Sequence, residues 1–107
     1  MVETSHVVVL VTTDTSEEAR KIADRLLNER KAACVNIVSG VSSFFWWQSK
    51  LDSAQEHLLV IKTRRMVLAD VIRLVKQIHS NEIPEVVALP IVGGNPDYLE
   101  WLDKEVR

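Results

Sequence analysis

The sequence predicts an α+β fold in which four strands form one sheet with helices on one of its faces. Short, mostly β-branched runs alternate with stretches whose apolar residues recur at helical spacing, in the order β-α-β-β-α-β. Right-handed crossovers in two β-α-β units give this order the ferredoxin-like arrangement. A short C-terminal helix follows, and the length of 107 residues predicts a single domain spanning residues 1–107.

The first strand and helix are predicted from one apolar run and one capping pattern. Val7–Val11 is continuous and mostly β-branched, as expected of an interior strand that is buried on both faces. Thr15 and Glu18 have the spacing of a capping box, in which the Thr15 hydroxyl accepts from the Glu18 amide and Glu18 reaches back. The helix is expected to end near Arg30–Lys31, after an apolar stripe formed by Ala19, Ile22, Ala23 and Leu26.

The middle of the chain is predicted to form a hairpin of unequal strands. Residues 32–47 are mostly β-branched, small or aromatic, which predicts one unusually long strand that is bent or bulged at Gly40. The polar residues 48–55 predict a connection. Leu58–Ile61 then predicts a third strand that pairs with the second.

The last third of the chain predicts a helix, a strand and a short helix. The second helix is expected over Arg65–His79, and the fourth strand over Val86–Ile91, where Pro90 predicts an edge position. Asn95 and Pro96 provide a cap and a first-turn proline for the final helix. The second helix presents one apolar face, formed by Leu68, Val71, Val75 and Ile78.

Composition and charge exclude several classes of protein. The 13 basic and 15 acidic residues give a formal charge of -2, which argues against nucleic-acid binding, because phosphate neutralisation needs a clustered positive surface. The longest apolar run is much shorter than the ~20 residues that span a bilayer. Hydrophobic residues nevertheless make up 47% of the chain. Since a short chain buries only part of its apolar area alone, we expect another chain to cover some of it.

Cysteine usage and the N-terminus predict a cytoplasmic location. The single cysteine, Cys34, excludes an intrachain disulfide and suits a reducing compartment. Met1–His6 lacks the basic and apolar regions of a signal peptide.

The sequence predicts no enzymatic activity. The first strand-to-helix turn, Thr12–Thr15, contains no glycine-rich phosphate loop, and its Asp14 would repel a phosphate. A small phosphatase on this kind of fold would need an anion-binding loop with an arginine at this turn. No nucleophile elbow is present, and Cys34 lies in a predicted strand, where packed thiols are commonly inert.

Metal binding is predicted only from isolated residues. The three histidines are scattered without ligand spacing. His79 closes the second helix before a loop that carries Glu82 and Glu85. The favoured interpretation is a histidine that interacts with the helix dipole and last carbonyls, and the alternative is a metal ligand. Cys34 is a chemically sensible soft ligand for copper(I), provided that the strand leaves it exposed.

Two apolar clusters predict contacts between chains. Phe44, Phe45, Trp46 and Trp47 alternate along the long strand and so face both ways, which favours a subunit interface over a core on one face only. The second helix carries additional apolar residues that widen its apolar face, which predicts a second interface with a further protein partner, natural or designed. Scattered exposed apolar residues are the alternative. These additional residues are Met66, Val67, Ile72 and Leu74.

Five segments resemble, in the right order, motifs of the CutA divalent-cation tolerance family. The first two are similar to that family's "E-[KR]-x-A-A-C-x-N" and "S-x-Y-x-W-x-G-K" patterns, and the third to its "I-K-T" strand. The last two are similar to "H-P-Y-x-x-P-E" and "Y-L-x-W-[LI]". The segments are Glu29–Ile37, Ser43–Leu51, Ile61–Thr63, His79 with Pro84 and Glu85, and Tyr98–Leu102.

The resemblance implies a ferredoxin-like protomer assembled as a homotrimer, similar to the PII signalling proteins. It implies a role in tolerance to divalent metals, chiefly copper, without enzymatic activity. It makes Cys34 and His79 the matching metal-ligand candidates, with Glu56 and Glu85 as acidic candidates near the same cleft between subunits.

The chain departs from the family pattern at three places. Phe45 stands where the family has tyrosine, Ser49 where it has glycine, and Ser80–Asn81 where it has Pro-Tyr. An alternative function is a non-catalytic, PII-like regulatory or scaffold trimer that binds a small molecule or a partner protein. Such a trimer could be a natural or engineered building block of a larger assembly.

Overall fold

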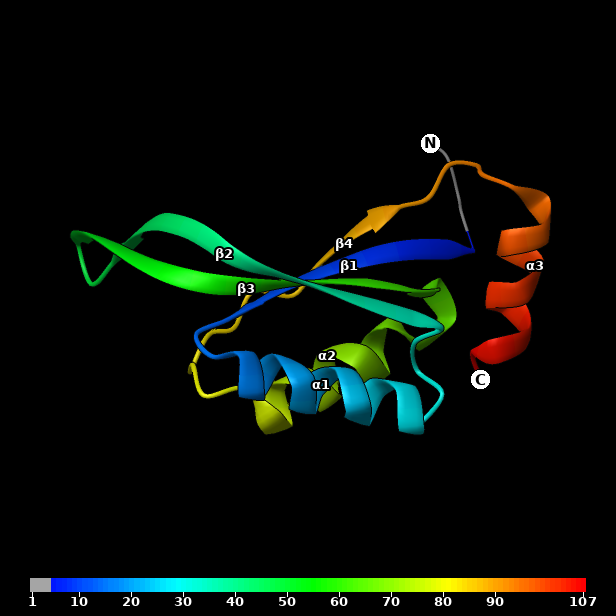
Figure 1. The fold of residues 1–107 in the computed structure, drawn as a ribbon, viewed down its shortest axis with the longest axis horizontal. Helices are drawn as coiled ribbons and strands as arrows, with labels where there is room; N and C mark the ends of the chain where they lie inside the picture. The colour runs from blue at the N-terminus through cyan, green and yellow to red at the C-terminus, as the bar shows by residue number, and fades with distance from the viewer. Residues whose placement is uncertain (1–4) are drawn as a thin grey trace.

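The computed structural model describes residues 5–107 and forms one antiparallel sheet of strand order β2-β3-β1-β4 (Figure 1). Residues 1–4 lie outside the described residues. They begin the Met1–His6 segment, in which the sequence predicts no signal peptide. Helices α1 and α2 cover one face of the sheet, so the predicted α+β, ferredoxin-like class is confirmed. The elements are β1 (His6–Thr13), α1 (Ser16–Asn28), β2 (Cys34–Trp47), β3 (Lys50–Arg64), η1 (Arg65–Val67), α2 (Leu68–Ile78), β4 (Val87–Pro90) and α3 (Pro96–Glu105).

The hydrophobic core lies between the sheet and the two helices α1 and α2. In β1, Val7, Val9 and Val11 face this core and are buried, whereas Val8 and Leu10 face the other side and remain half-buried. The interior position of β1, between β3 and β4, is confirmed. The expected burial on both faces is not found in the protomer, because α1 and α2 lie on the same side of the sheet.

Helix α1 begins at the predicted cap, but the carboxylate of Glu18 accepts hydrogen bonds from a different part of the chain than the capping box predicts. The Glu18 amide donates to the Thr15 hydroxyl at 3.1 Å. The Glu18 carboxylate accepts from the Ser80 amide at 2.5 Å and the Ser80 hydroxyl at 3.2 Å. The second half of the capping box is therefore replaced by a bridge to the loop after α2. The helix ends at Asn28, and Arg30, with φ +60°, turns the chain into β2.

Strands β2 and β3 form a hairpin much longer than the rest of the sheet. The prediction of a connection over residues 48–55 was wrong, because β3 starts at Lys50 and pairs with Trp47. Only Gln48 and Ser49 form the turn, at φ +50° and +65°. The polar residues 50–55 can form part of β3 because the helices do not cover this end of the hairpin, so these residues need no apolar face. The predicted bulge is confirmed, since the register shifts around Gly40, at φ +75°.

Fewer apolar residues of α2 and the turn before it are exposed than the sequence predicted. Val67 and Leu74 lie in the core, which corrects their assignment to a second interface. Leu74 follows Val71 by three residues and therefore shares its inward face. Met66 and Ile72 remain exposed, at 68% and 36%. The helix proper begins at Leu68, after a 3-10 turn that contains Arg65.

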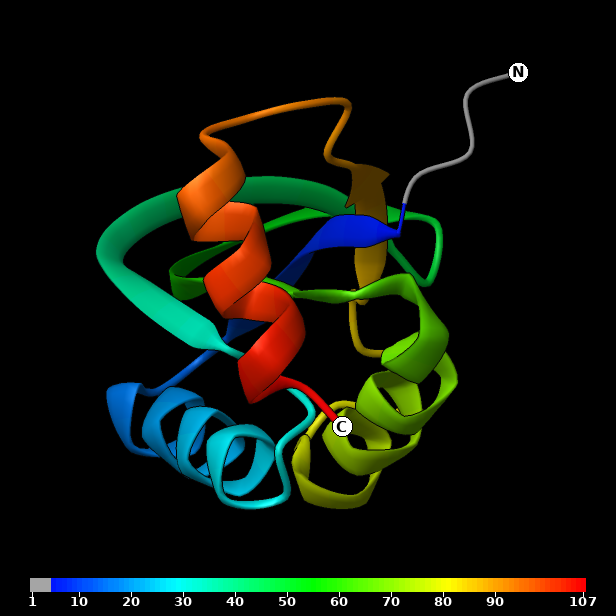
Figure 2. The ribbon, with the colours of Figure 1, turned by 90° about the vertical axis from the view of Figure 1, so that its right-hand side faces the viewer.

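The C-terminal segment crosses one end of the sheet (Figure 2). Strand β4 pairs only with β1, which confirms the edge position predicted from Pro90. Asn95 caps α3, as predicted, by accepting from the Asp97 amide at 3.0 Å. Asp103 of α3 lies 2.9 Å from His6 Nε2 at the start of β1, and Arg30, which follows α1, donates to Glu105 at 2.6 Å, so both contacts hold α3 against the rest of the domain.

Candidate functional site

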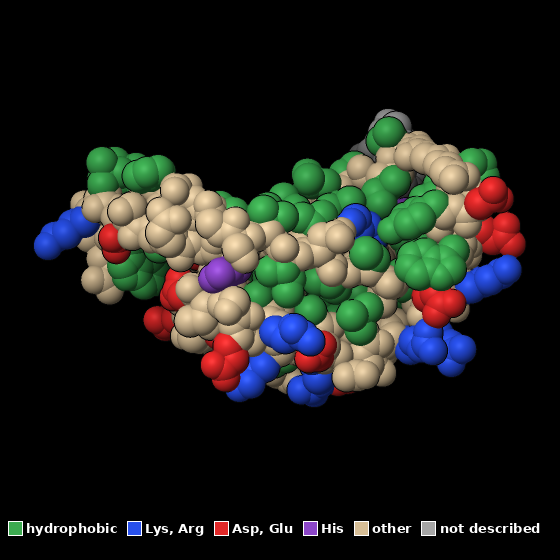
Figure 3. All heavy atoms as spheres, viewed as in Figure 1, with side chains coloured by type: hydrophobic (Ala, Val, Ile, Leu, Met, Phe, Trp, Pro, Cys, Tyr) green, Lys and Arg blue, Asp and Glu red, His purple; other side chains and the backbone are tan. Residues whose placement is uncertain are grey.

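The face of the sheet opposite α1 and α2 is largely apolar and partly open to solvent. Register places side chains from all four strands on this open face. Val38, Val87 and Leu89 are each about half-exposed. Figure 3 shows hydrophobic atoms across the hollow between the hairpin and the end of the molecule that carries α3. The open face is formed by Val8, Leu10, Val38, Leu58, Val60, Val87 and Leu89.

The hairpin tip exposes aromatic side chains on both of its faces. Phe44 and Trp46 are 79% and 70% exposed on the side continuous with the helix-covered face. Phe45 and Trp47 are less exposed and lie on the same side as the open face. Hydrophobic atoms are also gathered over this end of the hairpin in Figure 3. Among the described residues, no helix covers either side of the tip, as Figure 1 shows. The alternation agrees with the expected pattern, and the interface assigned to these residues stays a prediction.

His79 has both ring nitrogens engaged by the protein. The residue is buried at the C-cap of α2, where its Nε2 donates to the Thr12 carbonyl at 2.7 Å. Its Nδ1 accepts from the Asn81 amide at 3.0 Å. A carbonyl can only accept and an amide N–H can only donate, so the neutral ring carries its proton on Nε2. Metal ligation would require the Nδ1 lone pair that Asn81 now occupies.

Cys34 lies at the start of β2, on the open face and beneath α3. The thiol is half-buried and donates to Asn36 Oδ1 at 3.8 Å. Asn36 Oδ1 also accepts from the Lys62 ammonium. Tyr98 of α3 lies beside the thiol and stacks at a tilt with Trp101, with ring centroids 5.4 Å apart. A soft sulfur ligand therefore lies in a small polar cluster at the edge of an apolar surface.

The pKa of the Tyr98 hydroxyl depends on its contact with Cys34 in this cluster. Partial burial, and then the charge and hydrogen bond of Cys34, raise the pKa of Tyr98 above its ordinary value of 10.0. Because its folded pKa is above the unfolded one, the hydroxyl contributes to stability below pH 10.0, and that contribution is lost as pH rises through the folded pKa.

We expect the ultraviolet titration of the chain's single tyrosine to have its midpoint above pH 10.0. Cys34→Ala should shift this midpoint part of the way back, because burial remains. Lys76→Ala, on the outer side of α2, provides the control and should leave the midpoint unchanged. A Cys34→Ala midpoint equal to that of the wild type would exclude the contact.

The two acidic candidates differ in their surroundings. Glu85 is exposed in the loop before β4. Glu56 is only 9% exposed, on the open face opposite Val41 at the bulge. Within residues 5–107, no three His, Cys, Asp or Glu side chains come together as a metal site. The candidates His79, Cys34, Glu56 and Glu85 therefore form no complete site in one protomer.

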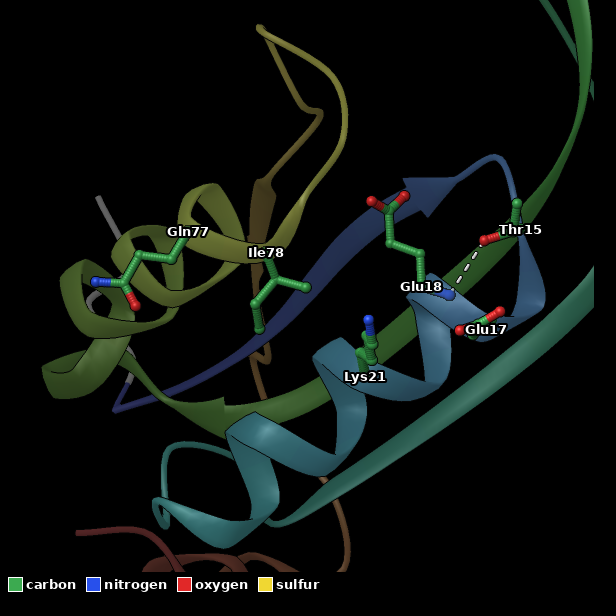
Figure 4. Close-up of a pocket in the computed structure, with 6 residues that line it drawn as sticks. All are labelled: Thr15, Glu17, Glu18, Lys21, Gln77 and Ile78. Carbon is green, nitrogen blue, oxygen red and sulfur yellow. Dashed lines mark hydrogen bonds between the residues drawn. The ribbon is translucent and has the colours of Figure 1, made fainter.

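A polar cleft of about 480 Å³ lies between α1 and α2 (Figure 4). The cleft is lined by two acidic residues, Glu17 and Glu18, and one basic residue, Lys21. The Glu18 side chain points toward the loop after α2, where it bridges to Ser80. That bridge gives both Glu18 carboxylate oxygens a hydrogen-bond donor within the protomer.

The fold and these residues can be compared with those of known proteins. A family model described as CutA1 divalent ion tolerance protein matches residues 7–105. The chain belongs to this CutA1 family. The chloroplastic protein CutA 1 of Oryza sativa is 46% identical over 101 residues, covering 94% of this chain and 57% of the rice protein. The divalent-cation tolerance protein CutA of Thermus thermophilus is 47% identical over 95 residues, covering 89% and 92%.

Solved CutA1 structures have the same fold. The divalent cation tolerance protein (Cut A1) of Thermus thermophilus superposes with a TM-score of 0.94 at 44% identity, covering 95% of this chain and 99% of that one. The crystal structure of CutA1 from Oryza sativa also gives 0.94 at 44% identity, covering 97% and 95%. This CutA1 chain spans a little over half the length of the two chloroplastic plant relatives. Among the described residues, no helix is long and apolar enough to cross a membrane.

Two contacts of this CutA1 chain were not predicted from its sequence. Tyr98 reaches Cys34 across 64 positions, and Glu18 reaches Ser80 across 62. Neither pair has a local spacing signal, because each depends on how two elements pack. The capping box was the one usable hint for Glu18, and it pointed to the wrong donor, the Thr15 amide instead of Ser80.

Proposed function

We propose that the protein is a homotrimer that binds a divalent or soft metal ion such as copper and acts in metal tolerance, without enzymatic activity. The observation that carries the assembly is the pair of uncovered apolar surfaces, the open sheet face and the hairpin tip. The metal role is supported by membership of the divalent ion tolerance family.

The two apolar surfaces support a ring rather than a simple dimer. A contiguous exposed apolar surface marks an interaction site on a protein. The hairpin tip, Phe44–Trp47, and the open face are different surfaces of one chain. A tip that seats on the face of the next copy makes a head-to-tail contact, and such contacts form a closed ring when the rotation between successive copies closes. Three copies are what the resemblance to the CutA family implies.

The proposed metal site lies between copies and is built around Cys34. Thiolates select copper(I) over harder ions. The described part of one protomer holds no group of three ligands, so a complete site needs side chains from a neighbouring copy. Glu85, being exposed, is available as a further ligand. His79 would first have to release the Asn81 amide.

Calorimetric titration with copper(I) tests this site. The wild type should bind with a defined stoichiometry per trimer, and Cys34→Ser should weaken binding at least about tenfold, because an alcohol replaces a thiolate. His57→Ala is the control, since His57 is held by Ser39 Oγ at 3.2 Å and lies on the opposite side of the sheet. Unchanged affinity and stoichiometry in Cys34→Ser would remove Cys34 from the site.

The second candidate function is a non-catalytic regulatory or scaffold trimer. The exposure of Met66 and Ile72 favours it, because Ile72 lines a shallow groove with Arg73 and Lys76. Thermal shifts separate the two functions: a metal protein should respond to copper, and a PII-like regulator to nucleotides or metabolites. A cytoplasmic location is part of the first proposal and is supported by the single, unpaired cysteine.

A further inference from the structure

Glu56 is a largely buried residue whose carboxylate has no partner among residues 5–107. It is only 9% exposed, and its carboxylate makes no hydrogen bond or ion pair with any of residues 5–107. Its strand neighbours on the same face are Ala54 and Leu58, and Val41 lies opposite. The surroundings defined by this register are therefore apolar on three sides.

Its carboxylate oxygens reach the surface of the protomer, because they are not buried atoms. Once another chain covers them, an ionised carboxylate is costly unless a cation or hydrogen-bond donors meet it. The open face is also the surface that the proposed assembly covers. Burying Glu56 further, still unpaired, would oppose assembly, so the second copy must bring a positively charged group to it. Glu56 therefore indicates that the group of the second copy that packs against it is positively charged.

The hairpin tip carries one suitable group. Lys50 is the only lysine or arginine among residues 34–61, and it makes no ion pair with any of residues 5–107. Six positions along a strand separate it from Glu56, a distance of about 20 Å, so the two cannot pair within one chain. Lys62, the other lysine on this face, is already bound to Asn36.

We propose that, in the assembled protein, the carboxylate of Glu56 accepts a salt bridge from the Lys50 ammonium of a second copy. The inference rests on the proposed homo-oligomer and deepens it by fixing the register of the contact. The tip and the open face are complementary in two independent ways. Aromatic side chains meet the apolar face, and the single cation of the tip meets the single buried acid of that face.

A double-mutant cycle tests the pair. The wild type, Glu56→Gln, Lys50→Gln and the double variant are compared by light scattering over a dilution series, in a fixed, sub-denaturing urea concentration, both with and without a chelator. Each single change should raise the concentration of half-dissociation at least about tenfold, and the double variant should be no worse than either single one. Glu17→Gln, which changes an exposed acid of α1 on the helix-covered side, should leave this concentration unchanged.

Each other outcome identifies what has failed. A wild type with the mass of one chain at all concentrations overturns the assembly itself. An assembled wild type in which the two single effects simply add overturns only the Glu56–Lys50 pair. If the chelator alone reproduces the Glu56→Gln effect and copper or zinc reverses it, the cation is a metal ion and the salt bridge is wrong. Near-ultraviolet circular dichroism confirms that each variant is folded.

Discussion

Replacing Phe44 and Trp46 together with serine is expected to reduce the proposed trimer to single chains. These side chains are 79% and 70% exposed in the protomer, on a tip that no helix covers. Burial of one such side chain contributes about 1.5–3 kcal/mol. A trimer has three equivalent contacts, so the change removes that contribution from every interface at once. Light scattering after size exclusion measures the mass directly.

A matched variant shows whether the effect is specific to the hairpin. Met66 and Ile72 are also exposed apolar residues, but they lie around α2, on the helix-covered side. Replacing both with serine should leave a trimer intact and should abolish only an assembly larger than three chains. If the hairpin variant keeps the mass of the wild type, the aromatic tip is not the interface.

Replacing His79 with alanine is expected to lower the free energy of unfolding by about 2–4 kcal/mol. The change breaks the bonds to the Thr12 carbonyl and the Asn81 amide and leaves a cavity at the end of α2. Urea unfolding at one fixed protein concentration measures the loss, because the stability of an oligomer depends on concentration.

His57→Ala provides the comparison for that experiment. His57 is half-buried and makes one hydrogen bond, to Ser39 Oγ, so its loss should cost about 1 kcal/mol or less. A copper(I) titration of His79→Ala separates the two roles considered for this residue. Lost stability with unchanged copper affinity means that His79 is structural. Lost affinity with unchanged stability means that it is a ligand.

The main elements of the fold could be predicted because their signals are local. Thr15 and Asn95 cap helices through side chains that act within three residues. Gly40 marks the bulge because the backbone there has a positive φ, which glycine adopts without strain. Pro90 marks an edge because it cannot donate to a second neighbouring strand.

The features that failed depend on distant partners. Residues 50–55 look like a loop because they are polar, yet they form a strand because the long β2 lies beside them. Leu74 looked available on a wide helix face, but α1 and the sheet cover it. The sequence predicted that His79 lies at the end of the helix and interacts with its last carbonyls. Its ring instead makes hydrogen bonds to the Thr12 carbonyl and the Asn81 amide. The Cys34–Tyr98 contact depends on where α3 docks.

The strand order has a consequence for how the chain is made in a cell. Strands β2 and β4 are both outer strands, so each leaves one row of backbone donors and acceptors without a neighbour. Along the 14 residues of β2 this row ends at the aromatic tip. Unpaired edges of this kind template pairing with unrelated chains. If the protomer assembles as proposed, pairing with its own copies competes with pairing to unrelated chains, and we therefore expect its yield to depend on expression level and chaperone supply.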